Sequence, residues 1–184
     1  MAFSIVRHGN GSRADIRVDW ERWMECADEL YLRFHNRLDG DSPLNYHEVA
    51  TVGFFASSAA MAGYLPMNEY DVFKKGKDAK RTKQRGRADL WFETGKRCYS
   101  FEFKRTRRPV TPAYLADRLD IAFNDVGCIH PDEYHYAAGC LITVASDPKR
   151  IAVCEEFART GELDFAFRIG PLGEPAFLFF RLRA

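Results

Sequence analysis

Residues 86–104 predict two β-strands joined by a tight turn, which restricts the chain to folds built on a β-sheet. The turn, Glu93-Thr94-Gly95-Lys96, is polar and contains a glycine. Side chains alternate between the two faces of a strand. The second strand alternates an aromatic set with a polar set: Tyr99, Phe101 and Phe103 against Cys98, Ser100, Glu102 and Lys104. One face of this hairpin is therefore expected to be buried.

A turn centred in the middle of this loop sets the register of the hairpin. It pairs Leu90 with Tyr99 and Asp89 with Ser100. Asp89 then lies on the polar face, as a diagonal neighbour of Glu102 at about 7–8 Å between backbones. A slip of one residue would move Asp89 to the aromatic face, so the side-chain pattern supports the register. Two carboxylates at this separation can converge on one divalent cation.

A third carboxylate, Glu48, belongs to a predicted helix upstream. Ser42-Pro43 combines a capping serine with a proline at the first helical position, and predicts a helix that runs to about Gly63. One stripe of this helix comprises Leu44, Glu48, Val52, Phe55 and Ala59. Glu48 thus takes a position where a core residue is expected. A buried carboxylate needs a charged or hydrogen-bonding partner, which a hydrated metal site would supply.

Together these residues resemble the PD-(D/E)XK nuclease superfamily, whose fold is that of the type II restriction endonucleases. The resemblance covers residues 43–145. It rests on Glu48 in the first core helix, Asp89 at the start of a strand, and Glu102-Phe103-Lys104 in the next strand. Ala88 stands where the family name has proline, a replacement common in the superfamily. The resemblance implies an α/β fold whose central mixed sheet is flanked by helices in the order αβββαβ, here with an extra N-terminal helix.

The resemblance also implies a Mg²⁺-dependent endonuclease, with Mn²⁺ able to substitute, that hydrolyses phosphodiester bonds. Asp89 and Glu102 would ligate the metal together with the carbonyl of Phe103. Glu48 would ligate a second ion or hold a water molecule. Lys104 would orient or deprotonate the attacking water, and would stabilise charge on the phosphate. DNA is favoured as the substrate because most of the superfamily cuts DNA, although the residues themselves are compatible with DNA or RNA.

Other interpretations of the same residues stay open. Glu102 and Lys104 would also suit the solvated face of an edge strand, and Asp89 could cap a turn or pair with Arg87. Glu48 could pair with a nearby arginine. The alternative function is a catalytically inactive module on the same fold that binds nucleic acid or a protein. A small-molecule enzyme is disfavoured, because the sequence has neither a phosphate-binding glycine loop nor a recognisable Ser/His/Asp arrangement.

Two basic clusters flank the predicted metal site. The first extends from Lys74 to Arg87 with Asp78 as its one acid, and the second follows Lys104. Positive charge beside a metal suits a phosphate backbone and binds it without sequence preference. The alternative is a solvated charged loop. The residues expected to contact nucleic acid are Lys80, Arg81, Lys83, Arg85, Arg87, Arg105, Arg107 and Arg108.

The rest of the chain predicts one nuclease-like domain over residues 1–184. It comprises an N-terminal arm and helix over 1–40, the core over 43–145, and a C-terminal helix with strands over 146–184. The arm, residues 3–18, would be a hairpin around Asn10-Gly11 or irregular, followed by a helix over 19–38. Further strands are predicted over 70–73, 137–144, 165–167 and 176–182, and further helices over 112–125 and 149–159. The apolar run 137–144 suits a buried central strand.

Composition narrows the class of protein further. Of the 184 residues, 46% are hydrophobic and 14% aromatic, as in a folded globule. No apolar run is long enough for a membrane span, and the net charge is only +1. The five cysteines are scattered without a Cys-x-x-Cys pair, and the N-terminus lacks the order of a signal peptide. We expect a reduced, cytoplasmic protein without disulfides, zinc or membrane contact.

A homodimer is also expected. Cutting both strands of a duplex with one active site per subunit is easiest for a two-fold dimer. The apolar run Phe177–Phe180 is a candidate interface, and the alternative for this run is an ordinary core strand.

Overall fold

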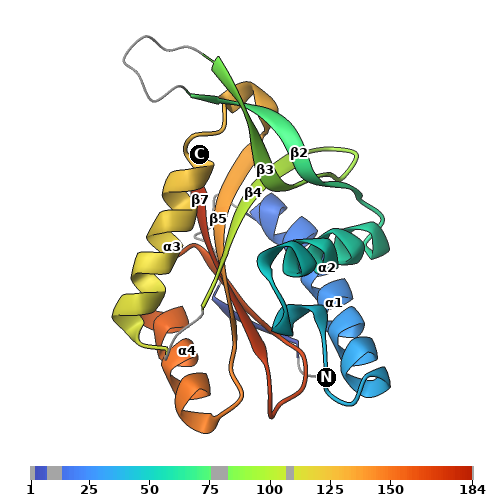
Figure 1. Ribbon diagram of the computed structural model, residues 1–184, viewed down its shortest axis with the longest axis vertical. Helices are drawn as coiled ribbons and strands as arrows, with labels where there is room; N and C mark the ends of the chain where they lie inside the picture. Colours follow the sequence, from blue (N-terminus) through green and yellow to red (C-terminus); the bar gives the residue numbers. More distant parts are fainter. Residues whose placement is uncertain (1–2, 8–13, 76–82, 107–109, 184) are drawn as a thin grey trace.

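The computed structural model describes residues 3–7, 14–75, 83–106 and 110–183, which form a seven-stranded mixed sheet with helices on both faces (Figure 1). The strands are β1 Ser4–Arg7, β2 Leu65–Lys75, β3 Lys83–Glu93, β4 Cys98–Arg105, β5 Tyr136–Val144, β6 Phe165–Ile169 and β7 Ala176–Arg183. The helices are α1 Ala14–Arg37, α2 Glu48–Met61, α3 Pro112–Val126 and α4 Pro148–Thr160, with 3-10 turns η2 Pro43–Asn45 and η3 Pro131–Glu133.

The strands lie in the order β1-β6-β7-β5-β4-β3-β2, with β4 and β5 parallel and the other neighbours antiparallel. The predicted class, an α/β chain with a mixed sheet flanked by helices, is confirmed. From α2 to β5 the elements follow the order αβββαβ. The predicted central strand is β5, which lies between β7 and β4. None of the described helices combines the length and the apolar character needed to cross a membrane.

The predicted N-terminal hairpin is wrong. Helix α1 begins at Ala14 rather than at Asp19, so the second half of the expected hairpin is helical. The reason is that Ile16 continues the buried stripe of Trp20 and Trp23, and all three are at most 1% exposed. Strand β1 pairs with β6 at the edge of the sheet instead. Residues 8–13, which include Asn10-Gly11, lie outside the described residues.

The helix predicted from Ser42 to Gly63 is divided in two. The Ser42 hydroxyl accepts from the N–H of Leu44 at 3.2 Å, but it caps only the 3-10 turn η2. Helix α2 has its own cap, because Nδ1 of His47 accepts from the N–H of Ala50 at 3.2 Å. Glu48 is therefore the first residue of α2. A carboxylate is favoured there by the positive end of the helix dipole.

The register of the β3–β4 hairpin differs from the predicted one. Leu90 lies opposite Phe101 rather than Tyr99, because the loop spans residues 94–97 and the N–H of Thr94 bonds to the carbonyl of Arg97 at 2.9 Å. The difference along β4 is two positions, which is one full side-chain period. Glu102 and Lys104 therefore keep the polar face that the sequence pattern predicts, whereas Asp89 lies one residue beyond the ladder and is not the diagonal neighbour of Glu102 expected.

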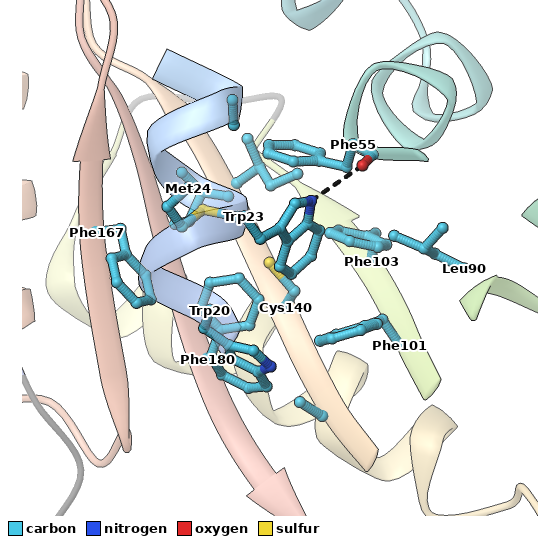
Figure 2. Close-up of a cluster of buried hydrophobic side chains, with 14 of the residues drawn as sticks. Trp20, Trp23, Met24, Phe55, Leu90, Phe101, Phe103, Cys140, Phe167 and Phe180 are labelled. Atoms are coloured by element: carbon cyan, nitrogen blue, oxygen red, sulfur yellow. Dashed lines mark hydrogen bonds between the residues drawn. The ribbon is translucent and has the colours of Figure 1, made fainter. Parts of the chain in front are cut away.

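The aromatic face of β4 packs against α1 and α2. Tyr99, Phe101 and Phe103 are fully buried. The indole of Trp23 lies among these rings, at 5.0 Å between its centroid and that of Phe101, and donates to the carbonyl of Phe55 at 3.0 Å (Figure 2). The polar face of β4 therefore points to the opposite side of the sheet, which α3 and α4 cover (Figure 1).

The candidate dimer interface is wrong. Strand β7 lies between β6 and β5, and all residues of Phe177–Phe180 are completely buried within one chain. The alternative, an ordinary core strand, is what the structure contains. A run of this kind is buried because both faces of a central strand are covered by helices.

Gly139 sets the distance between α3 and the sheet. It lies in β5 opposite Glu102 of β4. A Cβ atom at this position would lie 2.4 Å from the backbone N of Phe123 and 2.6 Å from the carbonyl carbon of Ala122. Both atoms belong to the α3 backbone, so a side chain at position 139 would force the helix away from the sheet.

Replacing Gly139 with alanine should therefore lower the free energy of unfolding by about 2–3 kcal/mol, the usual cost of overpacking a core. Gly53→Ala is the matched control. A Cβ atom there meets nothing within 4 Å, and alanine favours the helix by about 1 kcal/mol. Urea denaturation measures both changes. A wild-type midpoint for Gly139→Ala would contradict the close contact between α3 and β5.

Candidate active site

Asp89 lies where β3 separates from β4. The ladder between these strands runs from Glu93 opposite Cys98 to Leu90 opposite Phe101, and Asp89 is the next residue. Its carboxylate oxygen Oδ2 accepts from the backbone N–H of Phe103 at 2.7 Å. The β3–β4 ladder ends before Phe103, so the Asp89 side chain takes the place of a β3 backbone carbonyl as acceptor for this N–H. Beyond this point β3 continues with β2 as a long hairpin (Figure 1).

Glu102 is buried beside Asp89 and has its own cationic partner. It is 5% exposed, and its Oε1 lies 2.8 Å from Nζ of Lys74 on β2. Strand β4 lies between β3 and β5, so the interpretation of Glu102 and Lys104 as the solvated face of an edge strand is wrong.

Burial and charge raise the pKa of both carboxyl groups. For Asp89, burial and, to a lesser extent, the charge of Glu102 raise the pKa to about 7. The hydrogen bond from the N–H of Phe103 and the charge of Lys104 lower the pKa, but by less. Burial also raises the pKa of Glu102, and Lys74 opposes this shift. Burial is therefore the main reason why both acids ionise less readily than in water.

Lys104 points to the same face and is held by α3. Its Nζ lies 3.0 Å from Oδ2 of Asp125. Burial disfavours the charged ammonium and lowers its pKa. The hydrogen bond and charge of Asp125, with the charges of Glu48 and Asp89, have the larger effect, so the pKa of Lys104 is raised above its usual value. Lys104 is thus a cation at neutral pH. It can donate hydrogen bonds to a water or a phosphate oxygen, which favours the orienting role over proton abstraction.

Glu48 is half-buried at the first turn of α2. Its charge raises the pKa of both Asp89 and Lys104, so the three groups belong to one electrostatic neighbourhood. The sequence predicts Glu48 near the other acids, and its charge acts on the same groups in the structure.

The donor set suits a hard divalent cation. Mg²⁺ prefers carboxylate and carbonyl oxygens, and Asp89, Glu102, Glu48 and the carbonyl of Phe103 are of this type. Burial raises the pKa of Asp89 and Glu102, and a bound cation would stabilise their ionised forms. Within the described ranges, however, no three His, Cys, Asp or Glu side chains are arranged to hold a metal ion together. Glu102 is engaged by Lys74 instead.

Lys74 and Asp125 are site residues that the sequence analysis did not single out. Lys74 reaches the site from β2, and Asp125 from the end of α3. Lys74 belongs to the first basic cluster, but its partner depends on how two neighbouring strands pair. Asp125 belongs to a helix for which the sequence pattern predicts only the apolar, buried stripe. Nothing local in either segment signals the ion pair.

Three of the residues expected to contact nucleic acid have described side chains. Arg85 and Arg87 are exposed on β3, and Arg87 forms a long ion pair with Glu69 at 3.8 Å. Arg105 is half-buried and donates to the carbonyl of Leu44, so it ties β4 to η2. Lys83 begins β3. Lys80, Arg81, Arg107 and Arg108 lie outside the described residues.

Comparison with known proteins identifies no relative. No protein-family model, no curated protein and no solved structure matches the chain. Function is therefore inferred from the geometry and the charges of the site.

The raised pKa of Asp89 predicts a pH-dependent stability. The carboxyl ionises near 3.8 in the unfolded chain and near 7 in the folded protein. Between these values the folded state holds the extra proton, so its stability falls as the pH rises from about 4 to about 7. Asp89→Asn removes this loss and keeps an oxygen for the N–H of Phe103. Without metal, the free energy of unfolding of the variant should rise relative to that of the wild type between about pH 4 and about pH 7. The difference should reach about 2–4 kcal/mol at about pH 7.

Urea denaturation at pH values from about 4 to about 8, in the presence of a chelator, measures this difference. It should be constant above about pH 7. Parallel stability curves for the two proteins would show that Asp89 ionises in the folded state as it does in the unfolded chain.

Proposed function

We propose that the chain is a metal-dependent endonuclease of the PD-(D/E)XK type that hydrolyses phosphodiester bonds, with DNA as its substrate. The observation that carries this proposal is the hydrogen bond from the N–H of Phe103 to Asp89. It brings this carboxylate to the segment of β4 that holds buried Glu102 and Lys104, where β3 and β4 separate. The order of elements from α2 to β5 supports a restriction-endonuclease-like core. Metal-dependent hydrolysis of a phosphodiester needs carboxylates to hold the metal ion and a cation to stabilise charge on the phosphate, and these residues are of both kinds.

In this proposal Asp89, Glu102 and the carbonyl of Phe103 hold a magnesium ion, and Glu48 holds a second ion or a water. When bound, the ion withdraws charge from the scissile phosphate and favours ionisation of a nearby water. Asp89 already receives the N–H of Phe103 at 2.7 Å, which fixes one carboxylate oxygen and leaves the other for the metal. This hydrogen bond orients the group before substrate arrives.

Lys104 orients the attacking water and stabilises negative charge on the phosphate. Its ammonium is held by Asp125 at 3.0 Å, so its position is defined before substrate binds. Exposed Arg85 and Arg87 on β3 would contact the phosphate backbone. A two-fold dimer and a cytoplasmic location stay predictions.

A second candidate function is a catalytically inactive module on the same fold that binds nucleic acid or a protein. The observation in its favour is the ion pair between Lys74 and Glu102, which occupies an expected metal ligand. Such a module would need the charged cluster for folding and would bind its partner through the exposed arginines.

The two functions differ in a plasmid assay. With Mg²⁺ or Mn²⁺, the wild type should nick or cut plasmid, and Lys104→Ala and Glu102→Gln should each lower the rate by about a hundredfold or more. Lys96→Ala, an exposed lysine in the β3–β4 loop, is the matched control and should cleave normally. Fluorescence anisotropy should show that Lys104→Ala still binds DNA. DNA binding by the wild type without metal-dependent cleavage of any substrate would favour the inactive module.

If Arg85 and Arg87 contact nucleic acid, the affinity of the protein for duplex DNA should depend on the salt concentration. If both contact phosphates, replacing them with alanine should weaken binding of all duplex sequences alike. The slope of log affinity against log salt should flatten by about 0.9 for each lost contact. The control is Arg17→Ala with Arg22→Ala, two exposed arginines of α1. An equal slope in both double variants would exclude the β3 arginines as phosphate contacts.

A further inference from the structure

Lys74 reaches Glu102 across an intervening strand. It belongs to β2, whereas Glu102 belongs to β4, and β3 lies between them. Nζ of Lys74 lies 2.8 Å from Oε1 of Glu102, and the two side chains are 26% and 6% exposed. A pair this buried differs from a surface ion pair, because neither group keeps its full hydration and each depends on the other.

The lysine crosses β3 at a glycine. Gly86 pairs with Val72, two residues before Lys74. A Cβ atom at position 86 would lie 2.8 Å from Cδ of Lys74 and 3.0 Å from its Cγ. Only glycine leaves this path open for the lysine stem, so the reach of Lys74 to Glu102 depends on a second residue that touches neither charge.

The backbone of β2 is held in place at this point by contacts that do not involve the Lys74 side chain. The N–H of His130 donates to the carbonyl of Phe73 at 2.8 Å, and Lys74 forms a β-bridge with Ile129. Lys74 can therefore leave Glu102 by rotating its flexible side chain, without movement of the strand. The Lys74 side chain as a whole is about a quarter exposed.

We propose that Lys74 is a built-in cation that closes Glu102 to the metal ion, and that a phosphate group of the substrate draws it away; this rests on the proposed nuclease function. An ammonium and a divalent cation compete for one carboxylate, because their charges repel at close range. A phosphate offers the ammonium a new anionic partner. The Lys74 side chain is 26% exposed, so a phosphate can reach it from solvent.

Substrate and metal would then bind cooperatively. Nucleic acid frees Glu102 and raises the affinity for metal, and the metal must raise the affinity for nucleic acid by the same factor. The free protein would hold metal weakly and would load it together with substrate.

The first test measures Mn²⁺ affinity by electron paramagnetic resonance, without nucleic acid. Lys74→Met keeps the length of the stem and removes the charge, and should bind Mn²⁺ about tenfold more tightly than wild type. Gly86→Ala leaves both charged groups intact but displaces the lysine stem, and should act in the same direction. Gly53→Ala, where a Cβ atom meets nothing within 4 Å, should leave the affinity unchanged. Adding Glu102→Gln to Lys74→Met should abolish the gain.

The second test adds a short duplex of phosphorothioate DNA, which resists hydrolysis. The duplex should raise the Mn²⁺ affinity of the wild type about tenfold. Lys74→Met should show no further rise, because its Glu102 is already open. A rise of equal size in both proteins would overturn the release of Lys74 by phosphate.

The outcomes separate this inference from the proposed function. Equal Mn²⁺ affinities for wild type, Lys74→Met and Gly86→Ala would overturn the role of Lys74 and leave the nuclease proposal standing. Absence of Mn²⁺ binding that depends on Glu102, in every variant, would overturn both. If circular dichroism shows that Lys74→Met does not fold, Gly86→Ala decides the first test, because it removes no charge.

Discussion

The alternation of side chains along β4 is the constraint on which the site depends. Phe101 and Phe103 are buried against α1 and α2, and rings of this size dominate the energetics of a core. Because a strand turns every second side chain to the opposite face, Glu102 and Lys104 must enter the protein on the side of α3. Their burial follows from aromatic packing on the other face, and the cost of burying charge is met by ion pairs with Lys74 and Asp125.

The charges around Asp89 form an alternating set that a metal ion and a phosphate could rearrange. Lys74 and Lys104 each hold one acid, while Asp89 relies on a backbone N–H. A divalent cation added to this set would bind the carboxylates, and a phosphate would accept hydrogen bonds from the lysine ammonium groups. The same ion pairs that stabilise the free protein would thus compete with its ligands. This links the stability of the site to its proposed chemistry.

Much of the fold could be predicted from local pattern. The apolar run of β5 and the spacing of α3 and α4 depend on burial alone, so they were placed within a few residues. The errors arose where two local signals competed or where a partner was distant. Ser42-Pro43 caps a single turn because His47 caps the helix proper. Strand β1 pairs with β6, more than a hundred residues away, instead of folding back.

For the site, the sequence alone was sufficient to place Glu102 and Lys104 on one face of β4, because strand periodicity is a local property that survives a register error of two residues. The approach of Asp89 to this segment depends on its hydrogen bond with the N–H of Phe103. Only the tertiary structure decided which cation each acid meets. Lys74 depends on the pairing of three strands and on the gap at Gly86, and Asp125 depends on the approach of α3 to Gly139. Ion pairs between distant segments are set by packing distances, which no local pattern encodes.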